Sequence, residues 1–190
     1  MAGGRGARLG GVVKARIVVG AVSLLDRARA ALAGVDGRLI VAQGPHDLGG
    51  VADPPGWSGP LAGIVAAKDA DAEFLVSMAV DTPFFPHDFA ERAMAVVGDA
   101  DAAVARYEGQ PYFTNALWRL SALRTALEGD PETLSAGGIK GLVRRLNVVW
   151  LDWPEGPDSN PFANINSPDE LDAAERRAPD SGVGKAGQNR

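Results

Sequence analysis

Residues 73–83 have the sequence Glu-Phe-Leu-Val-Ser-Met-Ala-Val-Asp-Thr-Pro, an apolar run that ends abruptly at Asp81. Apolar side chains at nearly every position indicate a strand that is buried on both faces, as in a parallel sheet. Pro83 fixes the turn after it. Because ligands of α/β folds bind at the carboxyl ends of the strands, the pattern predicts a buried strand with Asp81 at the ligand-binding edge.

The segments on either side of this run alternate between strand and helix patterns. Further strands are expected at residues 38–42, 102–107, 112–117 and 147–150, and helices at 23–34, 59–67, 87–97, 120–127, 134–146 and 167–177. This alternation predicts an α/β fold: a three-layer α/β/α sandwich with a mainly parallel, Rossmann-like sheet. We expect one domain over residues 1–178 and a disordered, Gly-rich polar tail over residues 179–190.

Composition excludes several classes of protein. The 190 residues carry a net charge of −5, which argues against nucleic-acid binding, and they include no cysteine. The lack of cysteine excludes disulfides, Cys-ligated zinc, iron–sulfur clusters and thiol nucleophiles. No apolar run approaches the roughly 20 residues of a membrane span, and the N-terminus lacks the apolar core of a signal peptide. We therefore expect a cytoplasmic protein with neither membrane nor nucleic acid as a partner.

The first sixteen residues, Met1–Arg16, hold five glycines and four basic residues, and the first acid is Asp26. Glycine lets backbone N–H groups approach an anion closely, and basic side chains neutralise it, so one interpretation is a polyphosphate loop. A flexible basic tail is the other. Lys14 is accordingly either a phosphate ligand or a solvated surface lysine. The Walker A and G-x-G-x-x-G patterns are both absent.

Asp81 and two asparagines complete the candidate site. A carboxylate at a sheet edge beside phosphate is a typical Mg²⁺ ligand, although Asp-x-Pro is also common turn chemistry. Asn164 and Asn166 alternate in an extended segment, so their amides point the same way and could bond a polar ligand or metal-bound water. Their simpler role is in the turn and cap before the last helix, which Ser167 begins.

Four motifs occur in an order that resembles the molybdenum cofactor guanylyltransferases. Residues 1–14 are similar to the signature L-A-G-G-x-x-x-R-M-G-G-x-D-K of that family. The resemblance continues at Gly59-Pro-Leu-Ala-Gly63, at Asp81-Thr-Pro83 and at Asn164-Ile-Asn-Ser-Pro-Asp-Glu-Leu171. It spans nearly the whole chain except the tail, and it favours the functional interpretation of each motif.

The resemblance implies a set of site residues. The phosphate loop for GTP would comprise Met1, Ala2, Gly3 and Gly4. Arg8 and Gly11 would lie near the transfer site, and Lys14 would neutralise phosphate. Asp53 would contact guanosine, and Asp81 would hold Mg²⁺. Asn164 and Asn166 would face molybdopterin.

The implied reaction transfers GMP from GTP to molybdenum-molybdopterin and releases pyrophosphate. Asp81, Lys14 and Arg8 would act at the catalytic centre, with Mg²⁺ as cofactor. GTP and molybdopterin would be the partners, together with proteins that deliver or accept the pterin. Two alternatives remain: a related nucleotidyltransferase that uses CTP or a sugar phosphate, and a non-catalytic nucleotide-binding homologue.

The sequence departs from the family pattern at three places. Val13 replaces an aspartate, Ala42 stands where the family has an asparagine, and no strand precedes the glycine loop, with Met1 in place of a leucine. A missing first strand would leave unpaired edges on its two neighbours. We expect a chain starting at Met1 to be poorly stable or inactive, or to result from a mis-assigned start.

Overall fold

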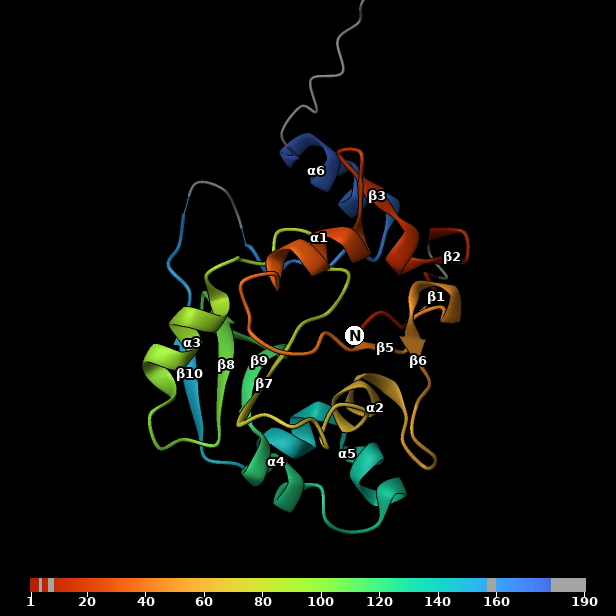
Figure 1. The fold of residues 1–190 in the computed structure, drawn as a ribbon. Coiled ribbons are helices and arrows are strands. Elements are labelled where there is room, and N and C mark those ends of the chain that lie inside the picture. The colour runs from red at the N-terminus through yellow and green to blue at the C-terminus, as the bar shows by residue number, and fades with distance from the viewer. Residues whose placement is uncertain (4, 7–8, 157–159, 179–190) are drawn as a thin grey trace, which may run out of the picture.

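The computed structural model describes residues 1–178 except residues 4, 7–8 and 157–159, and it centres on a four-stranded sheet (Figure 1). The strand order is β10-β8-β9-β7. The strands are β7 (Phe74–Ser77), β8 (Ala102–Tyr107), β9 (Gln110–Arg119) and β10 (Val148–Asp152). β10 runs parallel to β8, whereas β9 is antiparallel to both β8 and β7. The predicted α/β fold is confirmed, and its sheet is mixed because β9 reverses direction.

Alternate residues of β8 face two separate apolar cores, which makes the molecule three layers thick. Ala103 and Ala105 point into one core, and Ala102 and Val104 into the other. The first core contains residues from α1 (Leu24–Ala31), α3 (Phe89–Val97) and α6 (Pro168–Arg177). The second contains residues from α2 (Gly59–Val65), α4 (Leu120–Ala126) and α5 (Pro131–Val143).

Short strands and 3-10 turns make up much of the N-terminal third of the chain. They are β1 (Arg5–Gly6), β2 (Val12–Val13), η2 (Lys14–Arg16), β3 (Val18–Val19), β4 (Val22–Ser23), β5 (Val41–Ala42), η3 (His46–Leu48) and β6 (Gly50–Val51). The strand expected over residues 38–42 is thus shorter than the apolar pattern suggested. Among the described helices, none is both long and apolar enough to cross a membrane.

Two helix starts follow the predicted capping chemistry. The Ser23 side chain accepts a hydrogen bond from the Asp26 N–H at 3.1 Å, and α1 begins directly after it. The Ser167 side chain accepts from the Glu170 N–H at 3.3 Å at the start of α6. Each cap satisfies one of the N–H groups that have no partner within the helix.

Met1 and Ala2 occupy the space between β5 and the chain that follows β7. The Met1 amine donates to the Met78 carbonyl at 2.7 Å, and the Val80 N–H donates to the Met1 carbonyl at 2.9 Å, which is the bonding pattern of parallel strands. The Ala2 N–H donates to the Ala42 carbonyl at 2.7 Å. The edges that the sequence predicted to be unpaired are therefore partly paired here. The expected instability and inactivity stay predictions.

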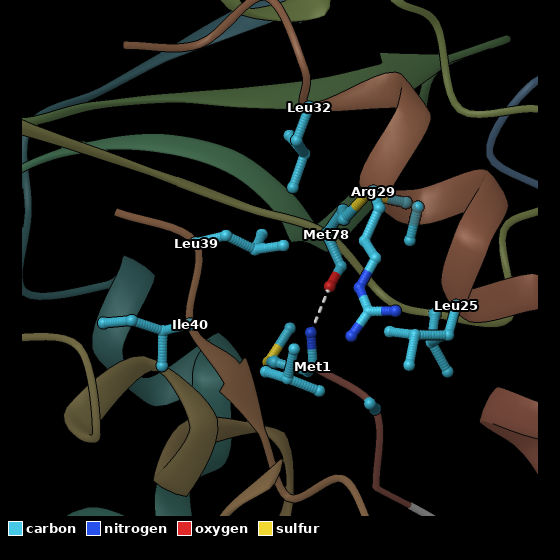
Figure 2. Close-up of a pocket in the computed structure, with 11 residues that line it drawn as sticks. Met1, Leu25, Arg29, Leu32, Leu39, Ile40 and Met78 are labelled. Atoms are coloured by element: carbon cyan, nitrogen blue, oxygen red, sulfur yellow. Dashed lines mark hydrogen bonds between the residues drawn. The ribbon is translucent and has the colours of Figure 1, made fainter. Parts of the chain in front are cut away.

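An apolar cavity lies beside Met1, between α1 and the segments that flank the N-terminus (Figure 2). Leu25 and Arg29 come from α1 and Leu32 from the cap that ends it. Leu39 and Ile40 come from the chain before β5, and Met78 from the chain after β7. The cavity puts the amine in surroundings with little water, so its charged form is poorly solvated.

The Met1 amine should make stability depend on pH. Burial lowers the pKa of this group from 8.0 to about 6, although the nearby Asp81 charge opposes the shift. Between these pKa values the unfolded chain binds more protons than the folded chain, so the free energy of unfolding rises as the pH rises from 6 to 8. We expect a gain of about 2 kcal/mol across that window in urea denaturation of a chain whose first residue is Met1.

A matched control for this measurement is the same chain with an acetylated N-terminus, which cannot titrate. The two chains should differ in the slope of the free energy against pH between 6 and 8. Equal slopes would show that the amine is not buried.

Candidate active site

Three residues predicted from separate motifs meet at one point. The Lys14 Nζ lies 2.6 Å from Asp81 Oδ2 and 2.5 Å from Asn166 Oδ1. Only 13% of the Lys14 side chain and 12% of the Asp81 side chain are exposed. Such shielding makes the ion pair stronger than one on the open surface, where exposed pairs contribute little. The convergence favours functional roles for all three residues.

The glycine-rich hairpin positions Lys14 beside Asp81 and Asn166. β1 and β2 pair in an antiparallel hairpin, and Gly10 and Gly11 form its turn with φ of 73° and 77°. Positive φ at two successive residues needs glycine, because a Cβ would clash with the backbone. η2 begins with Lys14 directly after β2, and its buried Ala15 anchors the turn in the core. Gly11 thus acts here by shaping the hairpin.

Hydrogen bonds on several sides hold the segment that carries Asp81. The Thr82 hydroxyl donates to the Ala79 carbonyl at 2.5 Å, and the Ile165 N–H donates to the Asp81 carbonyl at 2.9 Å. On the other edge, the Ala79 N–H donates to Asn115 Oδ1 at 3.2 Å. Asn115 is fully buried, and sequence reasoning missed it. A polar residue inside the apolar strand pattern of β9 was the available signal.

The two predicted asparagines have different surroundings. Asn166 contacts Lys14, whereas Asn164 is exposed, and the buried Ile165 lies between them. Glu170 adds a carboxylate to this corner, because the Asn166 N–H donates to Glu170 Oε2 at 2.6 Å. That hydrogen bond is the main cause of a lowered Glu170 pKa, and the Lys14 charge contributes in the same direction.

A second polar cluster lies where the nucleoside end of a ligand is expected. The Gln43 Nε2 donates to Asp53 Oδ2 and to the Gly59 carbonyl, both at 2.9 Å. Gln43 adopts a positive φ of 61°, and a Cβ on Gly3 would lie only 2.5 Å from the Gln43 Cβ. Gly3 therefore allows the phosphate loop to pass close to Gln43, a residue that sequence reasoning did not identify.

Glycine is also required where α2 faces the N-terminus. A Cβ on Gly63 would lie 2.6 Å from the Met1 Cγ and 3.3 Å from the Ala42 Cβ. The last glycine of Gly59–Gly63 thus lets α2 pack against the start of the phosphate loop. Among the other predicted site residues, Gly4 and Arg8 lie outside the described residues.

The acidic and amide oxygens of the site suit a hard cation. Within the described part of the chain, no three His, Cys, Asp or Glu residues cluster in a way that could hold a metal alone. Asp81 Oδ2 and Asn166 Oδ1 nevertheless both contact one ammonium group, so they present two oxygens to a single positive charge. Mg²⁺ is often bound by one or two protein oxygens, with waters and substrate phosphates as its other ligands.

A three-layer α/β fold with a glycine hairpin, a lysine and an edge carboxylate defines the nucleotidyltransferase class. The family model of the MobA-like NTP transferase domain matches residues 1–149. A molybdenum cofactor guanylyltransferase from Rhodobacter capsulatus is 37% identical, with 93% of each chain covered. One from Acidiphilium cryptum is 33% identical over 92% of this chain and 91% of its own length.

Solved structures agree on the fold. Molybdopterin-guanine dinucleotide biosynthesis protein A from Archaeoglobus fulgidus superposes with a TM-score of 0.71 at 22% identity, covering 92% of this chain and 94% of its own. A 2-C-methyl-D-erythritol 4-phosphate cytidylyltransferase from Thermus thermophilus gives a TM-score of 0.65 at 21% identity, covering 86% and 92%. The chain belongs to the MobA-like family of molybdenum cofactor guanylyltransferases. Enzymes of this kind generally need a divalent metal.

Proposed function

We propose that this protein transfers GMP from GTP to molybdenum-molybdopterin, forming the guanine dinucleotide cofactor and pyrophosphate. The observation that carries the proposal is the contact of Lys14 with both Asp81 and Asn166, which unites three motifs of the family. The similarity to guanylyltransferases over 93% of the chain supports the choice of substrates.

The chemistry follows from the charges of the reactants. A phosphate oxygen of the pterin attacks the α-phosphorus of GTP, a new P–O bond forms, and pyrophosphate leaves with the electron pair of the broken bond. Both reactants are anions, so the protein must position them and reduce their repulsion. No protein nucleophile is needed, which agrees with a chain that has no cysteine.

Each part of the site has a task in this scheme. Lys14 would bind a phosphate oxygen of GTP in exchange for its contacts with Asp81 and Asn166. Asp81 and Asn166 would together hold Mg²⁺, which when bound supplies positive charge to the phosphates. Asn164, which is exposed beside them, would hydrogen-bond the pterin substrate.

The loop and the second cluster would bind the other parts of GTP. The phosphate loop would comprise Met1, Ala2 and Gly3, with Gly11 shaping the hairpin. The roles of Gly4 in this loop and of Arg8 near the transferred phosphate are proposed from the family resemblance alone. Asp53 would hydrogen-bond guanosine, and Gln43 already contacts its carboxylate. Gln43 lies next to Ala42 and can supply the amide that Ala42 lacks.

One assay tests the proposal against its alternatives. The purified protein is incubated with molybdopterin, Mg²⁺ and each nucleoside triphosphate in turn, and pyrophosphate is measured. Release with GTP alone is expected. Release with CTP would instead indicate a cytidylyltransferase, and no release with any triphosphate would indicate a non-catalytic homologue. Chelation followed by addition of individual divalent ions tests the choice of Mg²⁺.

The same proposal implies where and with what the protein works. GTP is a cytoplasmic nucleotide, so we place the reaction in the cytoplasm. The pterin would be received from a protein that delivers it and passed to one that accepts the dinucleotide.

A further inference from the structure

Glu170 makes an unusual contact at the start of α6. In the common capping box, the third helical residue is an acid whose side chain bonds the N–H of the cap residue. Here the cap is Ser167, and the Glu170 carboxylate, besides its contacts with Ser167, accepts from the N–H of Asn166, one residue earlier, at 2.6 Å. The bond therefore reaches past the helix to a residue of the candidate active site.

Asn166 is consequently held from both sides. Its neighbour Ile165 donates its N–H to the Asp81 carbonyl at 2.9 Å, while its own N–H is taken by Glu170. Between these two backbone anchors the Asn166 side chain is directed to the site, where its Oδ1 accepts from Lys14 at 2.5 Å. Asn166 is partly exposed to solvent and Glu170 is exposed, so without this hydrogen bond water would compete for the Asn166 N–H.

The charge of Glu170 adds to this geometry. A hydrogen bond to an ionised carboxylate is shorter and stronger than one between neutral groups, which suits the short distance observed. The Asn166 N–H and the Lys14 charge both stabilise the ionised form. The carboxylate therefore stays charged at neutral pH and continues to accept the hydrogen bond from the Asn166 N–H.

We infer that Glu170 is a positioning residue, which fixes Asn166 so that its amide oxygen faces Lys14 and Asp81. Through this bond, α6 is connected to the reaction centre although no residue of the helix needs to touch substrate. The inference rests on the proposed role of Asn166 in guanylyl transfer. It concerns how that role is maintained.

Three variants test the inference. Glu170→Ala removes the acceptor and is expected to lower kcat/KM about tenfold or more, as loss of partners behind a ligand typically does. Glu170→Gln keeps an oxygen acceptor of the same length and should restore activity to within about threefold of the unmodified protein. Asp169→Ala removes the adjacent acid of the same first turn, with the same loss of helix-dipole stabilisation, and should leave activity unchanged.

A spectroscopic readout separates positioning from a general loss of stability. In ¹H–¹⁵N spectra of the substrate-free protein, the Asn166 amide proton should resonate downfield and exchange slowly. Glu170→Ala should move this signal upfield and speed its exchange, whereas Asp169→Ala should not. An unchanged Asn166 signal in Glu170→Ala would overturn the inference.

Asn166→Ala makes the two failures distinguishable. If this variant is fully active, the proposed role of Asn166 fails. If it is impaired while Glu170→Ala is normal, only the positioning inference fails. A third outcome is that Glu170→Gln is as impaired as Glu170→Ala. That result would show that the charge of Glu170 matters and its hydrogen bond to Asn166 does not, and it would also overturn the inference.

Discussion

Replacing Asp81 by alanine is expected to abolish pyrophosphate release, with a fall in kcat/KM of at least about 10³-fold. The Asp81 side chain is 12% exposed on the segment that follows β7, and its carboxylate is half of the oxygen pair that faces Lys14. Without it, a cation at this point would keep only the neutral amide of Asn166. Asp81→Asn, which preserves size, should be impaired almost as strongly because the charge is lost.

The control for this result is an aspartate in an exposed ion pair. Asp47 pairs with Arg16 at the surface, where the two side chains are 64% and 50% exposed. Asp47→Ala should change activity less than about twofold, since exposed pairs contribute little. Titration with Mn²⁺ in the absence of nucleotide provides a second readout, and Asp81→Ala should bind it much more weakly. Normal turnover by Asp81→Ala would remove this residue from the metal-binding role.

Lys14→Met is expected to reduce kcat/KM by about 10²-fold, because a positive charge near the phosphates is lost. The substitution should also destabilise the fold by about 2 kcal/mol, since it leaves the shielded Asp81 carboxylate without its cation. Arg16, two residues further on, lies at the surface, so Arg16→Met serves as the matched control. Kinetics and urea denaturation measure the two effects.

A double substitution separates the two effects of Lys14. Lys14→Met combined with Asp81→Asn removes both charges, so much of the lost stability should return while activity stays low. Equal stability losses in the single and double variants would contradict the ion pair. Full activity in Lys14→Met would show that phosphate is neutralised elsewhere.

The sequence predicted those parts of the molecule that depend on local chemistry. The apolar run before Asp81 gave the position of that carboxylate, and Ser23 and Ser167 gave the starts of two helices. The carboxyl-edge rule predicted that Asp81 lies near the N-terminal loop that carries Lys14, and the resemblance to the guanylyltransferases added Asn166 to the same site. These features follow from strand burial, capping and the direction of strands.

Other features depend on partners that only the folded chain brings together. The reversal at β9 follows from a two-residue turn, in which Glu108 and Gly109 have φ of 49° and 75°. That turn is typical of antiparallel hairpins, so the reversal was an exception that the local Glu-Gly pair could have indicated. The roles of Gln43 and Asn115 had no local signal of comparable strength, because their partners lie on other elements.

The contact between Lys14 and Asn166 joins positions 152 residues apart. During synthesis, the ribosome makes Lys14 and Asp81 long before Asn166, so a nascent chain cannot assemble the reaction centre until nearly the whole domain has emerged. Truncated products would carry the phosphate loop but not the asparagine segment that closes the site. Completion of translation thus becomes a condition for forming the Lys14–Asn166 contact.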